Sequence, residues 1–182
     1  EYYQTNEKSD EVNKYTYYMR ENKITQTSDD LIKLYKAWTD KYPIISIEDG
    51  MGQKDWKGWI ALTKELGNQI LIVGDDFITT KDTTIIEAIQ QQAINASLIK
   101  PNQIGTLSET ILAIAASLDG HCPVIISHRS KSPISAIEAW LALAVGALGQ
   151  KTGGAKNAER IYKYQAVALE MGYVEQGVTI PP

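Results

Sequence analysis

The chain has 182 residues, 43% hydrophobic and 22% charged, a composition typical of one globular domain or part of one. Its formal net charge is -4, from 18 basic and 22 acidic residues, and it has neither a Lys/Arg block nor zinc-finger spacing, so we expect no nucleic-acid partner. The longest apolar stretch, residues 139–148, is far shorter than the roughly 20 residues of a membrane helix, so we expect no membrane association.

The first part of the chain carries the weakest structural signal. Residues 1–27 are rich in Tyr, Asn, Lys and Glu with little periodicity, so we expect an irregular lead-in, with a hairpin as the alternative. The sequence begins with Glu1 rather than methionine and has no apolar signal-peptide core, which we interpret as an internal cut. We expect βα units over residues 28–172 and a tail over 173–182.

Strand and helix signals alternate along most of the chain. A helix is predicted over 29–41, capped by Thr27 and Ser28 and ended by Pro43. Short β-branched runs then recur roughly every 25 residues, and they predict strands over 44–47, 69–73, 96–99, 124–127 and, more weakly, 148–152. Amphipathic segments between and after them predict helices over 55–66, 82–91, 106–118, 133–148 and 158–171.

This alternation favours a parallel sheet covered by helices. In the helix predicted over 55–66, helical spacing puts Trp56, Trp59, Leu62 and Leu66 on one face, which we expect to pack on the sheet. A parallel barrel usually has eight strands, and at most five are found here. We therefore predict the α/β class, as a partial (β/α)8 TIM-type barrel of about five βα units, with an open α/β sheet as the alternative.

Ionisable residues follow each predicted strand. They are Glu48 and Asp49, Asp75 and Asp76, Lys100, the run His128, Arg129 and Ser130, and Lys151. Each one alone has a simpler explanation as a helix cap, a turn former or a solvated side chain. Their recurrence in consecutive units predicts a shared site, because the carboxyl ends of parallel strands open on one face.

These residue types suit one kind of chemistry. Carboxylates there would bind a hard cation such as Mg²⁺, which takes oxygen ligands. A lysine near a metal ion and a second lysine would have a lowered pKa and could act as a general base. The guanidinium of Arg129 and the hydroxyl of Ser130 suit a phosphate or carboxylate. There is no Walker loop, GxGxxG, nucleophile elbow or CxxC, and the only cysteine, Cys122, fits a reducing, cytoplasmic environment.

Several long motifs resemble the enolase family. They are YPIISIEDG at 42–50, VGDD at 73–76, LIKPNQIGTLSET at 98–110, ISHRS at 126–130 and AERIYKY at 158–164. They occur in that family's order and at similar spacing over nearly the whole chain, and the SIEDG form is similar to bacterial-type enolases. The resemblance implies the C-terminal part of the enolase barrel and Mg²⁺-dependent interconversion of 2-phosphoglycerate and phosphoenolpyruvate in glycolysis.

The resemblance also implies a role for each matching residue. Glu48 and Asp75 match two of three metal-binding carboxylates, and Lys100 matches the base that takes the proton from C2. Lys151 matches the second lysine, which contacts the substrate carboxylate, and His128 matches a substrate-contacting histidine. Arg129 and Ser130 match the contacts to the phosphate and to a second metal. Enolases are commonly dimeric, so we expect a homodimer of the full-length protein.

The chain departs from the family pattern in three places. The third metal carboxylate and a glutamate acid would lie upstream of Glu1, so we expect this chain alone to be inactive. The run SHRS continues with Lys131, Ser132 and Pro133 instead of a glycine and an acidic stretch, and the segment before Lys151 is one residue shorter. These departures keep two alternatives open: a catalytically impaired structural or interaction subunit, and a divergent superfamily member with another carboxylate substrate.

Overall fold

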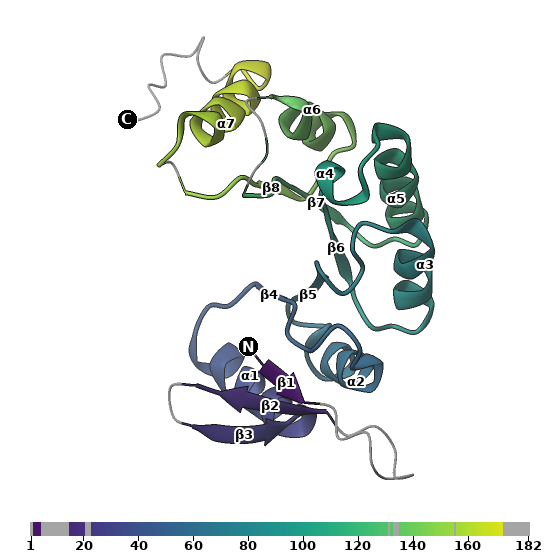
Figure 1. The fold of residues 1–182 in the computed structure, drawn as a ribbon, viewed down its shortest axis with the longest axis vertical. Helices are drawn as coiled ribbons and strands as arrows, with labels where there is room; N and C mark the ends of the chain where they lie inside the picture. Colours follow the sequence, from purple (N-terminus) through teal and green to yellow (C-terminus); the bar gives the residue numbers. More distant parts are fainter. Residues whose placement is uncertain are drawn as a thin grey trace. The chain divides into compact units, whose positions relative to one another are not determined.

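The computed structural model describes residues 2–4, 15–20, 23–130, 132, 135–154 and 156–172. The chain divides into two compact units (Figure 1). The first contains residues 1–78 and 87–95, and the second contains residues 79–86 and 96–182. Helix α3 (Asp82–Gln90) contributes residues to both.

The first unit starts with a small antiparallel sheet. Strands β1 (Tyr2–Gln4), β2 (Thr16–Met19) and β3 (Ile24–Thr27) pair in the order β1-β2-β3. This antiparallel pairing differs from the irregular lead-in expected for residues 1–27 and agrees with the hairpin given as the alternative. The strands are three or four residues long and mix Tyr with Thr and Gln, so they carry little hydrophobic alternation to predict them.

Two parallel strands and two helices complete the first unit. Helix α1 (Ser28–Lys41) starts with a capping box in which Thr27 and Asp30 each bond the other's main chain. Strand β4 (Ser46–Glu48) pairs in parallel with β5 (Leu71–Gly74), and α2 (Trp56–Leu66) connects them. Trp59, Leu62 and Leu66 are fully buried, and Trp56 lies edge-on to Phe77 at 4.6 Å between ring centroids. The predicted packing face of this helix is confirmed.

Three parallel strands form the centre of the second unit. Strands β6 (Ala96–Ile99), β7 (Val124–Ser127) and β8 (Gly149–Lys151) lie in that order. Leu98, Ile99 and Ile126 are almost fully buried, as expected where helices cover a parallel sheet. Helix α5 (Leu107–Asp119) packs on β6 and β7, α6 (Ile137–Ala144) packs on β7 and β8, and α7 (Ala158–Glu170) packs on α6 (Figure 1).

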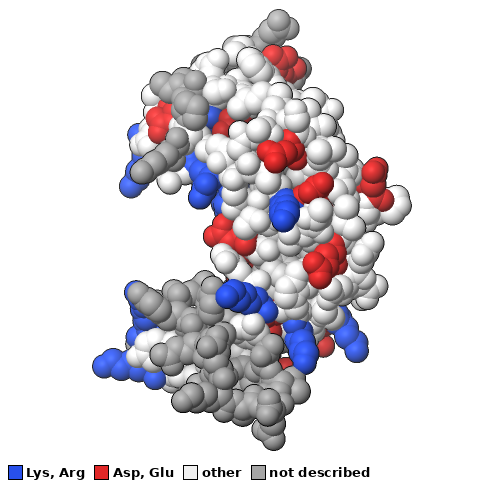
Figure 2. All heavy atoms as spheres, turned by 45° about the vertical axis from the view of Figure 1, so that its right-hand side comes forward, with Lys and Arg blue, Asp and Glu red and all other residues white. Residues whose placement is uncertain are grey.

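The predicted elements and the structure agree in order, with shifts at the ends. Helix α6 begins at Ile137, four residues after the predicted start, and a single turn, α4 (Pro101–Ile104), was not predicted. Residues 173–182, the predicted tail, lie outside the described residues. No helix in the described part is long and apolar enough to cross a bilayer. On the face drawn in Figure 2, described Lys and Arg residues are scattered, without a broad basic patch.

Candidate functional site

The predicted site residues lie at the carboxyl ends of the five parallel strands. Glu48 is the last residue of β4, Lys151 is the last residue of β8, and the others directly follow β5, β6 and β7, namely Asp75, Lys100 and His128 with Arg129 and Ser130. The groups in the first unit are carboxylates, and those in the second unit are mainly cationic.

The two candidate metal ligands of the first unit come from neighbouring strands. Glu48 pairs in register with Val73, two residues before Asp75, so both residues lie at the same edge of the β4–β5 pair. The Glu48 side chain is exposed, whereas Asp75 is 6% exposed. Carboxylate oxygens at such an edge are the donors that Mg²⁺ prefers.

Asp49 links the ends of β4 and β5. Its carboxylate accepts hydrogen bonds from the main-chain N–H groups of Asp75 and Asp76, both at 2.9 Å. Burial raises the pKa of the Asp49 carboxyl above its usual range, and the nearby Asp75 and Asp76 carboxylates act in the same direction. Because Asp49 is itself acidic, it adds negative charge to the edge that carries the two candidate ligands.

The donor set of the first unit fits Mg²⁺ in part. In the described residues there is no group of three or more His, Cys, Asp and Glu side chains placed to hold a metal ion. Mg²⁺ usually binds through one or two carboxylates and completes its octahedron with water and substrate oxygens. Glu48 and Asp75 can therefore provide the protein oxygens from this chain, and the remaining ligands must come from elsewhere.

In the second unit, a buried threonine positions Lys100. The main-chain N–H of Lys100 donates to the hydroxyl oxygen of Thr80 at 3.0 Å, and that hydroxyl donates to the side-chain oxygen of Gln103 at 2.9 Å. Thr80 is fully buried, and Thr79 and Thr80 have φ values of 48° and 57°. Such values are uncommon for β-branched residues, so this turn is a strained segment packed beside the candidate base.

The structure brings His128 together with Lys151. The main-chain N–H of His128 donates to the Lys151 carbonyl oxygen at 3.1 Å, and His128 Nδ1 lies 3.2 Å from the same oxygen. A carbonyl oxygen only accepts hydrogen bonds, so Nδ1 must carry the hydrogen in this contact. In the tautomer with hydrogen on Nδ1 alone, Nε2 can accept a hydrogen bond from a ligand.

The Arg129 main chain is held by a residue of the segment that departs from the family pattern. The Arg129 N–H donates to the Ser132 hydroxyl oxygen at 3.0 Å, and the Asn102 side-chain amide donates to the same oxygen, also at 3.0 Å. The side chains of Arg129 and Ser130 are exposed and accessible to an anion. Lys131, Pro133 and Ile134 lie outside the described residues.

Sequence reasoning missed the residues that hold the site residues in place, and it missed Arg160. A Cβ atom on Gly153, just after β8, would lie 3.1 Å from Arg160 Nη1 and 3.0 Å from His128 Cε1. Arg160, from the first turn of α7, and His128 therefore both approach the chain at Gly153. The available signal was the AERIYKY motif, which contains Arg160 and which we used only to recognise the family.

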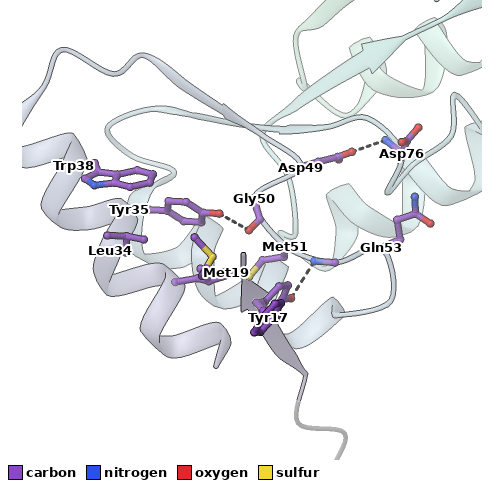
Figure 3. Close-up of a pocket in the computed structure, with 13 residues that line it drawn as sticks. Tyr17, Met19, Leu34, Tyr35, Trp38, Asp49, Gly50, Met51, Gln53 and Asp76 are labelled. Carbon is purple, nitrogen blue, oxygen red and sulfur yellow. Dashed lines mark hydrogen bonds between the residues drawn. The ribbon is translucent and has the colours of Figure 1, made fainter. Parts of the chain in front are cut away.

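The first unit also contains a pocket of about 320 Å³ lined mostly by aromatic and apolar residues (Figure 3). Tyr17, Met19, Tyr35 and Trp38 contribute to its wall. None of the residues with a predicted catalytic, substrate-binding or metal-binding role lines this pocket. It does, however, reach the ends of β4 and β5, because Asp49 and Asp76 also line it.

The parallel strands alternate with helices, as in an α/β barrel. The candidate site residues, which include carboxylates, lysines and an arginine, lie at the ends of these strands. Residues 1–175 match the family of the enolase C-terminal TIM barrel domain. The chain belongs to the enolase family, and the predicted class of a partial α/β barrel is confirmed.

Two curated relatives are bacterial proteins named Enolase. The chain is 43% identical over 164 residues to the protein of Helicobacter pylori strain HPAG1 and 44% identical over 164 residues to that of strain J99. In both cases the match covers 90% of this chain and 38% of the relative. The chain thus spans well under half the length of these relatives.

Proposed function

We propose that the protein carrying this chain is a Mg²⁺-dependent hydro-lyase that interconverts 2-phosphoglycerate and phosphoenolpyruvate in glycolysis. The observation that supports this most is the order of the strand-end groups, carboxylates on β4 and β5 followed by cations on β6, β7 and β8, in a chain of the enolase family. A substrate with a carboxylate and a phosphate needs positive charge around it, and a bound Mg²⁺ would stabilise the enolate charge that forms during the reaction.

Lys100 is the residue that we propose as the base. It takes the C2 proton, and Thr80 fixes the direction from which its side chain leaves the main chain. The Thr80 hydroxyl is a neutral acceptor.

The remaining residues of the second unit bind the anionic groups. We propose that Arg129 and Ser130 contact the phosphate, since a guanidinium forms paired hydrogen bonds with phosphate oxygens. Lys151 contacts the substrate carboxylate, where charge accumulates in the enolate. His128 contacts the substrate through Nε2, because its Nδ1 faces the Lys151 carbonyl oxygen.

A second candidate function is a structural or interaction subunit without turnover. The segment after Ser130 favours it, because Lys131 and Ser132 stand where the family normally has a glycine and an acidic stretch. Ser132 argues against a disrupted loop, since its hydroxyl binds the main chain of Arg129. We therefore favour the catalytic function and propose a cytoplasmic homodimer.

The deciding experiment measures phosphoenolpyruvate formation by the full-length protein with Mg²⁺. We expect turnover by the native protein and a loss of about 10²-fold to 10⁴-fold or more in kcat for Lys100→Ala, as for removal of a general base. Lys64→Ala, at an exposed position of α2, is the matched control and should retain full activity. No turnover by the native protein would favour the structural subunit. We expect none from the isolated chain, because Glu48 and Asp75 supply only part of a ligand set.

A further inference from the structure

We propose that Asp49 is a positioning residue that fixes the main chain at Asp75, so that the Asp75 carboxylate is aimed at the same cation as Glu48. The hydrogen bonds between Asp49 and the main chain at Asp75 and Asp76 are observed in the structure. Their effect on cation binding rests on the proposed function. We assign Asp49 a positioning role and not a ligand role, because each of its carboxylate oxygens accepts a hydrogen bond from the main chain at the end of β5.

Three hydrogen bonds tie Asp49 to the end of β5. Its main-chain N–H donates to the Val73 carbonyl oxygen at 3.0 Å, which continues the parallel pairing by one residue. Its Oδ1 and Oδ2 atoms accept from the N–H groups of Asp75 and Asp76 at 2.9 Å each. Figure 3 shows the Asp49 side chain extended toward the main chain at Asp76. The carboxylate thus holds the two residues at which the chain leaves β5.

The backbone of Asp49 suits this task. Its φ is 46°, in the left-handed region, which aspartate and asparagine adopt more readily than most residues. This conformation turns the chain directly after Glu48 and lets the short side chain reach across to the neighbouring strand. Asparagine at this position would keep the backbone preference, so the substitution tests the carboxylate and not the turn.

Only a carboxylate can satisfy both donors. Each N–H needs an acceptor, and a carboxylate offers two acceptor oxygens, whereas an asparagine amide offers one oxygen and one NH₂ group. In Asp49→Asn, one of the two main-chain N–H groups would face another donor and lose its partner. The start of the Asp75 loop would then be held by one bond instead of two.

A matched control lies in the same unit. Asp55 is also a buried carboxylate, 2% exposed, and it also accepts a main-chain hydrogen bond, from Gly58 at 2.9 Å. Its other partners are the hydroxyl groups of Tyr17 and Ser28, and none of these residues is a candidate metal ligand. Asp55→Asn should therefore affect folding stability without affecting cation binding.

The test uses the full-length protein without substrate. Mn²⁺ is titrated as a paramagnetic substitute for Mg²⁺, and electron paramagnetic resonance reports the unbound ion. We expect Asp49→Asn to raise the Mn²⁺ Kd by about 10-fold to 100-fold, the usual effect of removing a group that orients a ligand. Asp55→Asn should leave the Kd within about twofold of the native value while lowering the denaturation midpoint.

Hydrogen–deuterium exchange of the metal-free protein separates the contact from its consequence. We expect faster exchange in a peptide containing Asp75 and Asp76 for Asp49→Asn, but not for Asp55→Asn. Faster exchange with an unchanged Kd would overturn the positioning role and leave the proposed function intact. If the native protein binds no Mn²⁺, the proposed function is overturned. If exchange at Asp75 and Asp76 is unchanged in Asp49→Asn, Asp49 does not hold this segment, whatever the result of the Mn²⁺ titration.

Discussion

The connections that follow β4 and β7 both carry candidate site residues, and each leads into a helix that starts near a buried carboxylate. The two carboxylates differ in their hydrogen-bond partners. Asp55, the N-cap of α2, accepts hydrogen bonds from the Tyr17 and Ser28 hydroxyls at 2.6 Å each and from the Gly58 N–H at 2.9 Å. All of these donors are uncharged. They belong to β2, α1 and α2, so this one carboxylate joins three elements of the first unit.

Glu138, in the first turn of α6, is instead paired with a cation. Lys163 of α7 donates to its carboxylate at 2.7 Å and to the Ser135 carbonyl oxygen, also at 2.7 Å. Lys163 is fully buried and Glu138 is 4% exposed. The ion pair therefore fixes both the end of the β7–α6 connection and the contact between α6 and α7.

This difference predicts how the stability of each connection responds to substitution. Three uncharged groups donate hydrogen bonds to Asp55, so a substitution that removes one donor leaves two in place. Around Glu138, removing the lysine leaves a buried carboxylate without its counter-ion, which is far more unfavourable than losing a neutral hydrogen bond. We therefore expect graded effects in the β4–α2 connection and an abrupt effect in the β7–α6 connection.

The largest expected effect comes from Lys163→Met. Breaking a buried ion pair by removing one partner usually lowers the free energy of unfolding by about 3–5 kcal/mol. The methionine fills much of the lysine volume, so the loss reports the charge and not a cavity. Chemical denaturation of the full-length protein measures it.

Two further variants make this test specific. Lys156→Met, at an exposed position, should change the free energy of unfolding by less than about 0.5 kcal/mol. The double variant Glu138→Leu with Lys163→Met removes both charges and should recover much of the stability, since apolar replacements of buried pairs are often tolerated. If the double variant is less stable than Lys163→Met alone, unpaired charge is not the cause of the loss.

In the other connection, Tyr17→Phe should have an intermediate effect. The Tyr17 hydroxyl donates to Asp55 and accepts from the Gly52 N–H at 3.0 Å, so the variant leaves one donor unsatisfied and removes one partner of the carboxylate. A hydrogen bond to a charged group contributes about 1.5–3 kcal/mol, which sets the expected loss. Tyr18→Phe, on the exposed neighbour, is the control, and an equal loss in both variants would contradict the role of Asp55.

The same tyrosine predicts a pH dependence confined to alkaline solution. Burial, with the hydrogen bond to Asp55 as a second cause, raises the pKa of Tyr17 well above its usual value. In the unfolded chain tyrosine loses its proton from about pH 10, while folded Tyr17 keeps it. The folded state then binds more protons, so its stability falls as pH rises above about 10. Denaturation midpoints at increasing alkaline pH should fall less steeply for Tyr17→Phe than for the native protein.

The sequence was sufficient to predict the strand-end positions of the candidate residues but not the groups that hold them. Residues after short apolar runs can be located from local pattern, and Asp75 and Lys100 lie where that pattern puts them. The acceptor of the Asp75 N–H is 26 residues away along the chain, and that of the Lys100 N–H is 20 residues away. Such partners depend on strand pairing and loop packing, which local periodicity does not determine.

The smallest expected effect, Ser132→Ala, tests whether the β7–α6 connection depends on more than its ion pair. Ser132 is 8% exposed, and its hydroxyl accepts from the Arg129 N–H and from the Asn102 amide, so the variant removes two neutral hydrogen bonds near the surface. We expect a loss of about 0.5–1.5 kcal/mol in the free energy of unfolding for each bond that water does not replace. Ser108→Ala, at an exposed position in α5, is the control.

The functional effect of this variant should be clearer than its effect on stability. If Arg129 binds the phosphate, loosening its main chain should raise KM for 2-phosphoglycerate several-fold and leave kcat less affected, since the arginine would contribute mainly to binding. Lys163→Met should lower the amount of folded protein without this selective change, because the Lys163 ammonium group donates to Glu138 and to the Ser135 carbonyl oxygen and so holds α6 and α7 together. An unchanged KM in Ser132→Ala would mean that phosphate binding by the Arg129 side chain does not depend on the hydrogen bond between Ser132 and the Arg129 main chain.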